Sequence, residues 1–149
     1  MNYTNHILKN VEDTAKLATS VSKEFKPGLI IFLQGDLGAG KTTFVRLILK
    51  ALNYHEKVKS PTYNLVETHQ VGQFTINHFD LYRFGSPEEW YSGGFDEYLQ
   101  SKNTITIIEW PEKISGVLIT PDIHINIIVN NDQREVSIES HTQLKICSN

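Results

Sequence analysis

Residues 35–42 read Gly35-Asp36-Leu37-Gly38-Ala39-Gly40-Lys41-Thr42, which fits the pattern G-x-x-x-x-G-K-[ST] at every fixed position. The run before it, residues 29–33, is uniformly apolar and predicts a strand that is buried on both faces. After it, apolar residues recur with helical spacing as far as Leu52, and Asn53 marks the expected end of the helix. A strand, a glycine loop and a helix in this order form the context in which the pattern binds phosphate.

The residue types of this phosphate-binding loop explain its chemistry. Glycines let successive backbone N–H groups approach phosphate oxygens without an intervening Cβ atom. The N-terminus of the following helix adds the positive end of its dipole. The side chain of Lys41 would then reach the β- and γ-phosphates, and the Thr42 hydroxyl would ligate Mg²⁺. The alternative is a chance match in an ordinary glycine turn, and the flanking strand and helix argue against it.

The composition indicates one soluble, globular domain over residues 1–149, long enough to bury a core. Apolar residues make up 40% of the chain and charged residues 21%, and a net charge of −3 does not by itself indicate nucleic-acid binding. The single cysteine, Cys147, excludes an internal disulfide and suits a reducing compartment. No signal peptide opens the chain and no apolar run approaches the length of a membrane span. We therefore expect a cytoplasmic protein with no membrane partner.

A helix is also predicted before the loop. Asn10 is typical of an N-cap, and Asp13 stands three residues later, as in a capping box. A short strand at Ile7-Leu8 precedes this helix, which should stop before Pro27-Gly28. The apolar residues that we expect it to turn inward are Val11, Leu17, Ala18, Val21 and Phe25.

Several strands are predicted after the loop. They are residues 64–69, 74–80, 104–108, 123–129, 134–140 and 144–146, with tight hairpin turns near Gly72 and Asn131. A short helix with Ser86 as its cap should stop at Gly93-Gly94 and be followed by one more turn. The pattern as a whole predicts an α/β fold: a single P-loop NTPase-like domain with a mixed sheet, flanking helices and antiparallel hairpins.

Two acids end apolar strands, Asp80 after residues 76–79 and Glu109 after residues 105–108. In an open α/β sheet, ligands gather at the carboxyl ends of the strands, and nucleotide hydrolysis needs an acid near the metal. Thr62 could act as a threonine that contacts the metal or the γ-phosphate. The alternatives are two surface carboxylates and a plain turn threonine. His78 and Asp80 share a strand face, but no further histidine or cysteine cluster supports a zinc site.

Four blocks of sequence carry a wider resemblance. They are residues 35–44, Ser60-Pro61-Thr62-Tyr63, His78-Phe79-Asp80-Leu81-Tyr82-Arg83 and Glu109-Trp110-Pro111. In order and spacing the chain resembles the TsaE family, the small bacterial P-loop ATPases of the tRNA threonylcarbamoyladenosine pathway. The resemblance implies hydrolysis of ATP with Mg²⁺ in support of two partner proteins, TsaD and TsaB, which attach threonylcarbamoyl to an adenosine of tRNA. Contact of this chain with tRNA would be indirect.

The resemblance also implies roles for individual residues. It makes Lys41, Asp80 and Glu109 catalytic, and Thr42 and Glu109 ligands of Mg²⁺. It places Trp110 beside the site. The residues implied to bind the nucleotide are Val11 (through its backbone only), Leu37, Gly38, Ala39, Gly40, Lys41, Thr42, Thr43 and Thr62.

Three functions remain open on the residues alone: an ATPase that drives or resets a partner complex, a small-molecule kinase, and a non-catalytic binding module gated by nucleotide. Kinases of this kind usually need several arginines around the transferred phosphoryl group and a lid. This chain has only Arg46, Arg83 and Arg134, and no arginine-bearing lid insertion. Two acids at strand ends argue against pure binding without excluding it. The absence of an N-K-x-D motif makes a guanine nucleotide the less favoured ligand.

Overall fold

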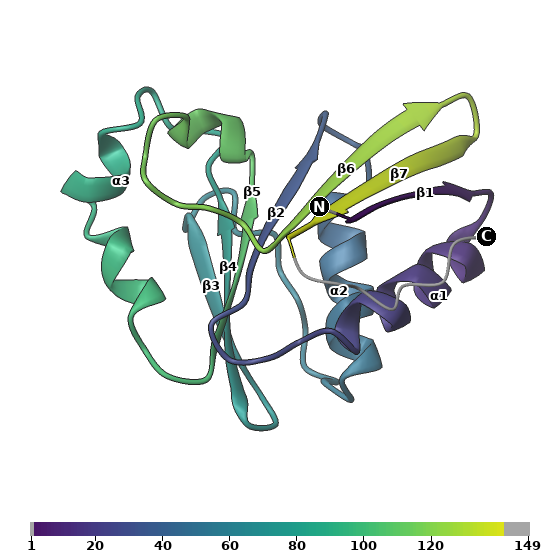
Figure 1. The fold of residues 1–149 in the computed structure, drawn as a ribbon, viewed down its shortest axis with the longest axis horizontal. Helices are drawn as coiled ribbons and strands as arrows, with labels where there is room; N and C mark the ends of the chain where they lie inside the picture. The colour runs from purple at the N-terminus through teal and green to yellow at the C-terminus, as the bar shows by residue number, and fades with distance from the viewer. Residues whose placement is uncertain (1, 142–149) are drawn as a thin grey trace.

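A seven-stranded mixed sheet organises residues 2–141, the part of the chain that the computed structural model describes (Figure 1). In spatial order its strands are β1 (Asn2–Leu8), β7 (Gln133–Ser140), β6 (Ile123–Asn130), β2 (Ile30–Gly35), β5 (Thr104–Glu109), β4 (Phe74–Asp80) and β3 (Val66–Val71). The central strands β6, β2, β5 and β4 are parallel to one another. The outer pairs β1–β7, β7–β6 and β4–β3 are antiparallel, so the predicted hairpins and the α/β fold class are confirmed.

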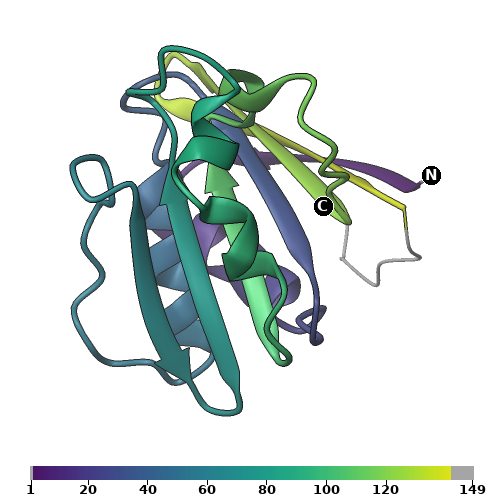
Figure 2. The same cartoon turned by 90° about the vertical axis from the view of Figure 1, so that its left-hand side faces the viewer.

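Helical segments cover both faces of the sheet (Figure 2). Helices α1 (Val11–Ser22) and α2 (Lys41–Ala51) pack together on one face. The other face carries the short helix α3 (Glu89–Ser92) and the 3₁₀ turns η1 (Phe95–Leu99) and η2 (Pro111–Ile114). Within residues 2–141, no helix combines the length and apolar character needed to cross a bilayer.

Each face has its own apolar cluster. In β5, Ile105 and Ile107 belong to the cluster under α1 and α2, whereas Ile108 belongs to the cluster under α3. All of the residues of β5 are buried, as expected for a central parallel strand that is covered on both faces. The second cluster is largely aromatic, with the fully buried Phe79 and Trp90 rings 5.2 Å apart between their centres.

The N-cap of α1 and the end of α2 are found as the sequence predicts, whereas α1 ends at Ser22, before Phe25, which is expected to belong to it. The side chain of Asn10 accepts a hydrogen bond from the backbone N–H of Asp13 at 2.8 Å, and the Asp13 carboxylate accepts one from the N–H of Lys9 at 2.9 Å. Helix α2 gives way at Leu52 to Asn53, which takes the left-handed conformation (φ 66°) that often ends helices. These local predictions are confirmed because each depends on a hydrogen bond between residues that are close in sequence.

Several expectations about the N-terminal half are corrected. Strand β1 runs over seven residues rather than the expected two, because it pairs with β7 from Asn2 to Leu8. The side chain of Val11 is 67% exposed instead of facing inward, since it occupies the first position of α1, outside the packed stripe. The expected last strand, residues 144–146, lies outside the described residues.

Two expectations further along the chain are also corrected. The side chain of Ser86 makes no cap for α3, which begins only at Glu89, after a turn in which the N–H of Glu89 donates to the Ser86 carbonyl at 3.3 Å. Strand β3 begins at Val66 and not at residue 64, because Leu65 before it has a left-handed backbone (φ 65°) that cannot continue a strand.

Mild acid should destabilise this fold through two buried histidines. Burial lowers the pKa of His6, and burial together with the neighbouring His78 lowers the pKa of His69 against the opposing effect of Glu67. In the unfolded chain both histidines regain a pKa near 6.5, so the unfolded state binds more protons below that pH. Stability is therefore complete above about pH 6.5 and falls as the pH drops below it. Thermal midpoints measured from about pH 7.5 to 5.5 should decrease.

The variant His69→Gln provides the control for this prediction. It removes one of the two depressed histidines, so its thermal midpoint should fall less steeply over the same range. An equally steep fall in the variant would show that His69 is not a source of the pH dependence.

Candidate functional site

The phosphate-binding loop joins β2 to α2, and its glycines are required by its backbone. Gly38 (φ 79°) and Gly40 (φ 100°) both take left-handed conformations that residues with a Cβ atom rarely adopt. A Cβ atom on Gly35 would lie 2.9 Å from the carbonyl oxygen of Ile127 on β6. The loop can therefore keep its backbone close to β6 and turn into the helix only with glycine at these positions. Leu37, at the tip of the loop, has an exposed side chain.

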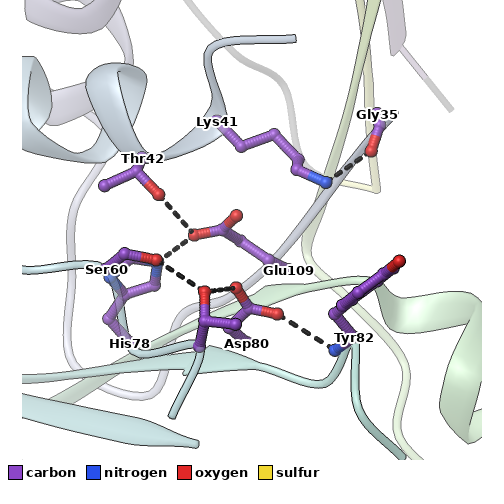
Figure 3. Close-up of polar contacts among 9 residues, drawn as sticks. Gly35, Lys41, Thr42, Ser60, His78, Asp80, Tyr82 and Glu109 are labelled. Atoms are coloured by element: carbon purple, nitrogen blue, oxygen red, sulfur yellow. Dashed lines mark hydrogen bonds and ion pairs between the residues drawn. The ribbon is translucent and has the colours of Figure 1, made fainter. Parts of the chain in front are cut away.

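The buried Lys41 side chain folds back over this loop (Figure 3). Its Nζ atom donates a hydrogen bond to the carbonyl of Gly35 and lies 3.8 Å from the centre of the Trp110 ring. Burial lowers the pKa of Lys41, and the nearby carboxylates of Glu109, Asp80, Glu112 and Asp36 oppose this effect. Lys41 thus holds its ammonium group against the backbone of the loop, between the Gly35 carbonyl and the Trp110 ring.

The two predicted acids are direct neighbours in the sheet. Strands β4 and β5 are parallel, and their register pairs Asp80 with Glu109 at the carboxyl ends of both strands. Both side chains are buried. The Thr42 hydroxyl, in the first turn of α2, donates to Glu109 Oε2 at 3.4 Å. The structure thus brings together Lys41, Thr42, Asp80 and Glu109, residues that the sequence places in three separate segments.

Thr62 belongs to a loop, residues 60–65, that closes over Asp80; we call it the switch loop. The Thr62 hydroxyl donates to Asp80 Oδ2 at 2.9 Å and lies 2.8 Å from the Ser60 hydroxyl. The backbone N–H of Tyr82 donates to the other oxygen, Oδ1, at 3.0 Å (Figure 3). Both oxygens of Asp80 are therefore held, one by the switch loop and one by its own strand end.

His78 is a member of the site that reasoning from the sequence left without a role. Its Nε2 atom lies 2.5 Å from Glu109 Oε2, and the ring is fully buried. The sequence does contain one signal: His78 and Asp80 stand two residues apart, so both side chains leave β4 on the same face. The contact itself depends on the register between β4 and β5, which the sequence does not state.

A cavity of 280 Å³ opens beside the loop, between α1 and α2. Val11 and Asn10, at the start of α1, line it together with Gly40 and Thr43. Arg134 on β7 also lines it and donates from Nε to the carbonyl of Ala39 at 3.0 Å. Val11 thus lies next to the phosphate-binding loop, where the family resemblance places it, and its role in binding the nucleotide stays a prediction.

The sequence model of the family described as "Threonylcarbamoyl adenosine biosynthesis protein TsaE" matches residues 8–137, a range that contains every residue of this site. The chain belongs to the TsaE family. This family membership confirms the resemblance carried by the four sequence blocks.

Named relatives agree over most of the chain. The Rickettsia felis protein named "tRNA threonylcarbamoyladenosine biosynthesis protein TsaE" is 44% identical over 131 residues, covering 87% of this chain and 75% of the relative. A protein of the same name from Haemophilus influenzae is 42% identical, and the match covers 78% of this chain and 73% of that protein. A third, from Bacillus subtilis, is 32% identical, and the match covers 86% of this chain and 80% of that protein. The crystal structure of Bacillus subtilis YdiB superposes with a TM-score of 0.74 at 26% identity, covering 95% of this chain and 87% of that one.

The switch loop should depend on its hydrogen bond to Asp80. Thr62→Val keeps the side-chain shape and removes the donor, and a hydrogen bond to a carboxylate contributes about 1.5–3 kcal/mol. We expect the Leu65 amide, which donates to the Pro61 carbonyl at 2.7 Å, to exchange its hydrogen at least about tenfold faster in the variant. Ser60→Ala is the matched control, because it leaves the bond between Thr62 and Asp80 in place. Equal exchange in wild type and Thr62→Val would contradict this role.

Proposed function

We propose that this protein hydrolyses ATP and thereby supports the tRNA threonylcarbamoyladenosine pathway, by activating or resetting a complex of TsaD and TsaB. The observation that carries the proposal is the convergence of Lys41, Thr42, Asp80 and Glu109 at one edge of the sheet. A phosphate-binding loop alone explains binding, whereas hydrolysis also needs acids beside it. Membership of the TsaE family and the names of the relatives support the pathway.

The nucleotide would lie along the loop and the adjoining cavity. Its phosphates would accept hydrogen bonds from the loop's backbone N–H groups at the N-terminus of α2, and Lys41 would leave the Gly35 carbonyl to contact them. The cavity lined by Val11, Gly40 and Thr43 is continuous with the loop and would receive the nucleoside. The α1 residues that line this cavity, Val11 and Thr14, have small side chains, and Val11 is apolar. The affinity for ATP would therefore come mainly from contacts with its phosphates.

The donor set fits Mg²⁺, which prefers hard oxygen ligands from one or two protein side chains together with phosphate oxygens. The Thr42 hydroxyl and the Glu109 carboxylate, 3.4 Å apart, would hold it. Bound there, Mg²⁺ would neutralise charge on the phosphates. Asp80 lies one strand away, and its carboxylate is held by Thr62 and by the N–H of Tyr82. We assign it the task of orienting the attacking water.

Arginine is scarce at this site, which favours a slow ATPase over a kinase. Arg83 stacks over the Tyr63 ring at 4.3 Å, and Arg134 is bonded to the Ala39 carbonyl. An arginine that stabilises the transferred phosphoryl group increases turnover by roughly 10³–10⁵-fold, so a site without one reacts slowly. A partner complex that completes or compresses the site, pressing on the switch loop and on residues 109–111, would raise the rate.

Removing the charges of the site should abolish turnover without unfolding the protein. Lys41→Ala removes the cation that contacts the phosphates, and Asp80→Asn and Glu109→Gln keep the shape of each acid without its charge. We expect losses of at least about 100-fold in phosphate release for each variant in the presence of TsaD and TsaB, with an unchanged circular dichroism spectrum. A folded Lys41→Ala protein with full activity would falsify the assignment of the loop, and normal hydrolysis by either acid variant would show that acid to be structural.

The purified protein alone should hydrolyse ATP slowly and respond to its partners. Since no arginine completes the site, we expect steady-state phosphate release to rise by about tenfold or more when TsaD and TsaB are titrated in together. Arg83→Ala should leave the basal rate unchanged, because that side chain is engaged with Tyr63. If the purified protein hydrolysed ATP fast and the rate did not change when TsaD and TsaB were added, the protein would instead be a self-sufficient enzyme.

A further inference from the structure

Among residues 2–141, the fully buried His78 makes one polar contact, and that contact is with Glu109. In the register of β4 with β5, His78 pairs with Ile107 while Asp80 pairs with Glu109, so the imidazole reaches across to the next residue on its own face of the sheet. On that face its neighbours Ile76 and Ile107 are fully buried and apolar, while Asp80 follows two residues later at the end of the strand. An apolar side chain would suit such a position as core, and a histidine there needs another explanation.

The two ring nitrogens of His78 have different surroundings. For Glu109 Oε2 to accept this hydrogen bond, the shared proton must be on Nε2 of the imidazole, because a histidine ring nitrogen donates only when it carries a proton. The other nitrogen, Nδ1, is buried and has no hydrogen-bond partner among the described residues. His69 and Glu67, on the adjacent strand β3, also face this part of β4. The ring therefore leaves one nitrogen unsatisfied, at a cost in stability, while the other holds Glu109.

We propose that His78 is a positioning residue that fixes the Glu109 carboxylate for the metal and nucleotide, an inference that rests on the proposed function. The short bond from His78 occupies Oε2, and the described residues give Oε1 no hydrogen bond. Oε1 would then be the oxygen that remains to ligate Mg²⁺. The Thr42 hydroxyl also reaches Oε2, but at 3.4 Å, and it would turn to the metal when one is bound. His78 would then be the donor that keeps Glu109 in place.

A bond of this kind has a measurable effect on metal affinity. Partners that hydrogen-bond to a metal's ligands orient those ligands, and their removal typically costs about 10–100-fold in metal affinity. His78 acts on Glu109 and not on the loop that receives the phosphates, so it should alter the contribution of Mg²⁺ while leaving metal-free nucleotide binding alone. This separation distinguishes positioning from a general effect on the fold.

A pair of amide variants tests the proposal. In His78→Gln the amide nitrogen is as many bonds from Cβ as Nε2 is, so it can still donate to Glu109. In His78→Asn the amide is one bond shorter and stops at the place of Nδ1, short of the carboxylate. The affinity for a fluorescent ADP analogue would be measured with Mg²⁺ and with EDTA, and the ratio of the two affinities gives the contribution of the metal.

We expect His78→Asn to reduce this ratio by about tenfold or more and His78→Gln to keep it within about threefold of wild type. All three proteins should bind the analogue equally in EDTA. Equal ratios in both variants, whether unchanged or equally reduced, would overturn the positioning role while leaving the proposed function intact. If the wild type itself gained no affinity from Mg²⁺, the proposed magnesium site would fail, and the inference would fail with it.

A measurement on the wild type does not depend on how well the variants fold. In protein labelled with ¹⁵N-histidine, the nitrogen chemical shifts of the His78 ring report which nitrogen carries the proton. The proposal requires the proton on Nε2 and a bare Nδ1 in the nucleotide complex with Mg²⁺. A proton on Nδ1 with a bare Nε2 would contradict it, because Nε2 could then donate nothing to Glu109.

Discussion

The parallel register between β4 and β5 is the constraint on which the site depends. It sets Asp80 beside Glu109, and the pairing of β2 with β5 sets Leu33, two residues before the loop begins, beside Glu109 as well. Three strand ends therefore deliver the loop and both acids to one edge of the sheet. The hydrogen bonds from Thr42 and Thr62 can form only because their carboxylate acceptors are already fixed there. A slip of one residue in β4 would turn Asp80 to the opposite face.

Much of this arrangement follows from local patterns in the sequence. The glycine loop, the helix after it and the cap at Asn10 depend on residues within a few positions of one another, so their signals are complete in the sequence. The acids at the ends of apolar runs could be expected to converge, because parallel strands of an open α/β sheet present their carboxyl ends on one edge. That rule predicts a shared edge without stating which strands are neighbours there.

What the sequence could not provide depends on contacts between distant segments. Strand β1 extends over seven residues because β7 supplies partners for residues such as Asn2 and Asn5, which have low strand propensity. The exposure of Val11 depends on where α1 starts relative to the sheet. The bond between His78 and Glu109 joins residues 31 positions apart, and its existence depends on the register of two strands. Hydrophobic periodicity predicts none of these three features, because each depends on contacts between distant segments.

The most direct test of the central claim, that one edge of the sheet forms a single site for nucleotide and metal, is a crystal structure with Mn²⁺ and a non-hydrolysable ATP analogue. The account predicts an anomalous Mn²⁺ peak between Thr42 and Glu109, phosphates along residues 35–42, and the Lys41 side chain moved from the Gly35 carbonyl to those phosphates. A nucleotide bound away from the loop, or a metal held without Thr42 and Glu109, would contradict it.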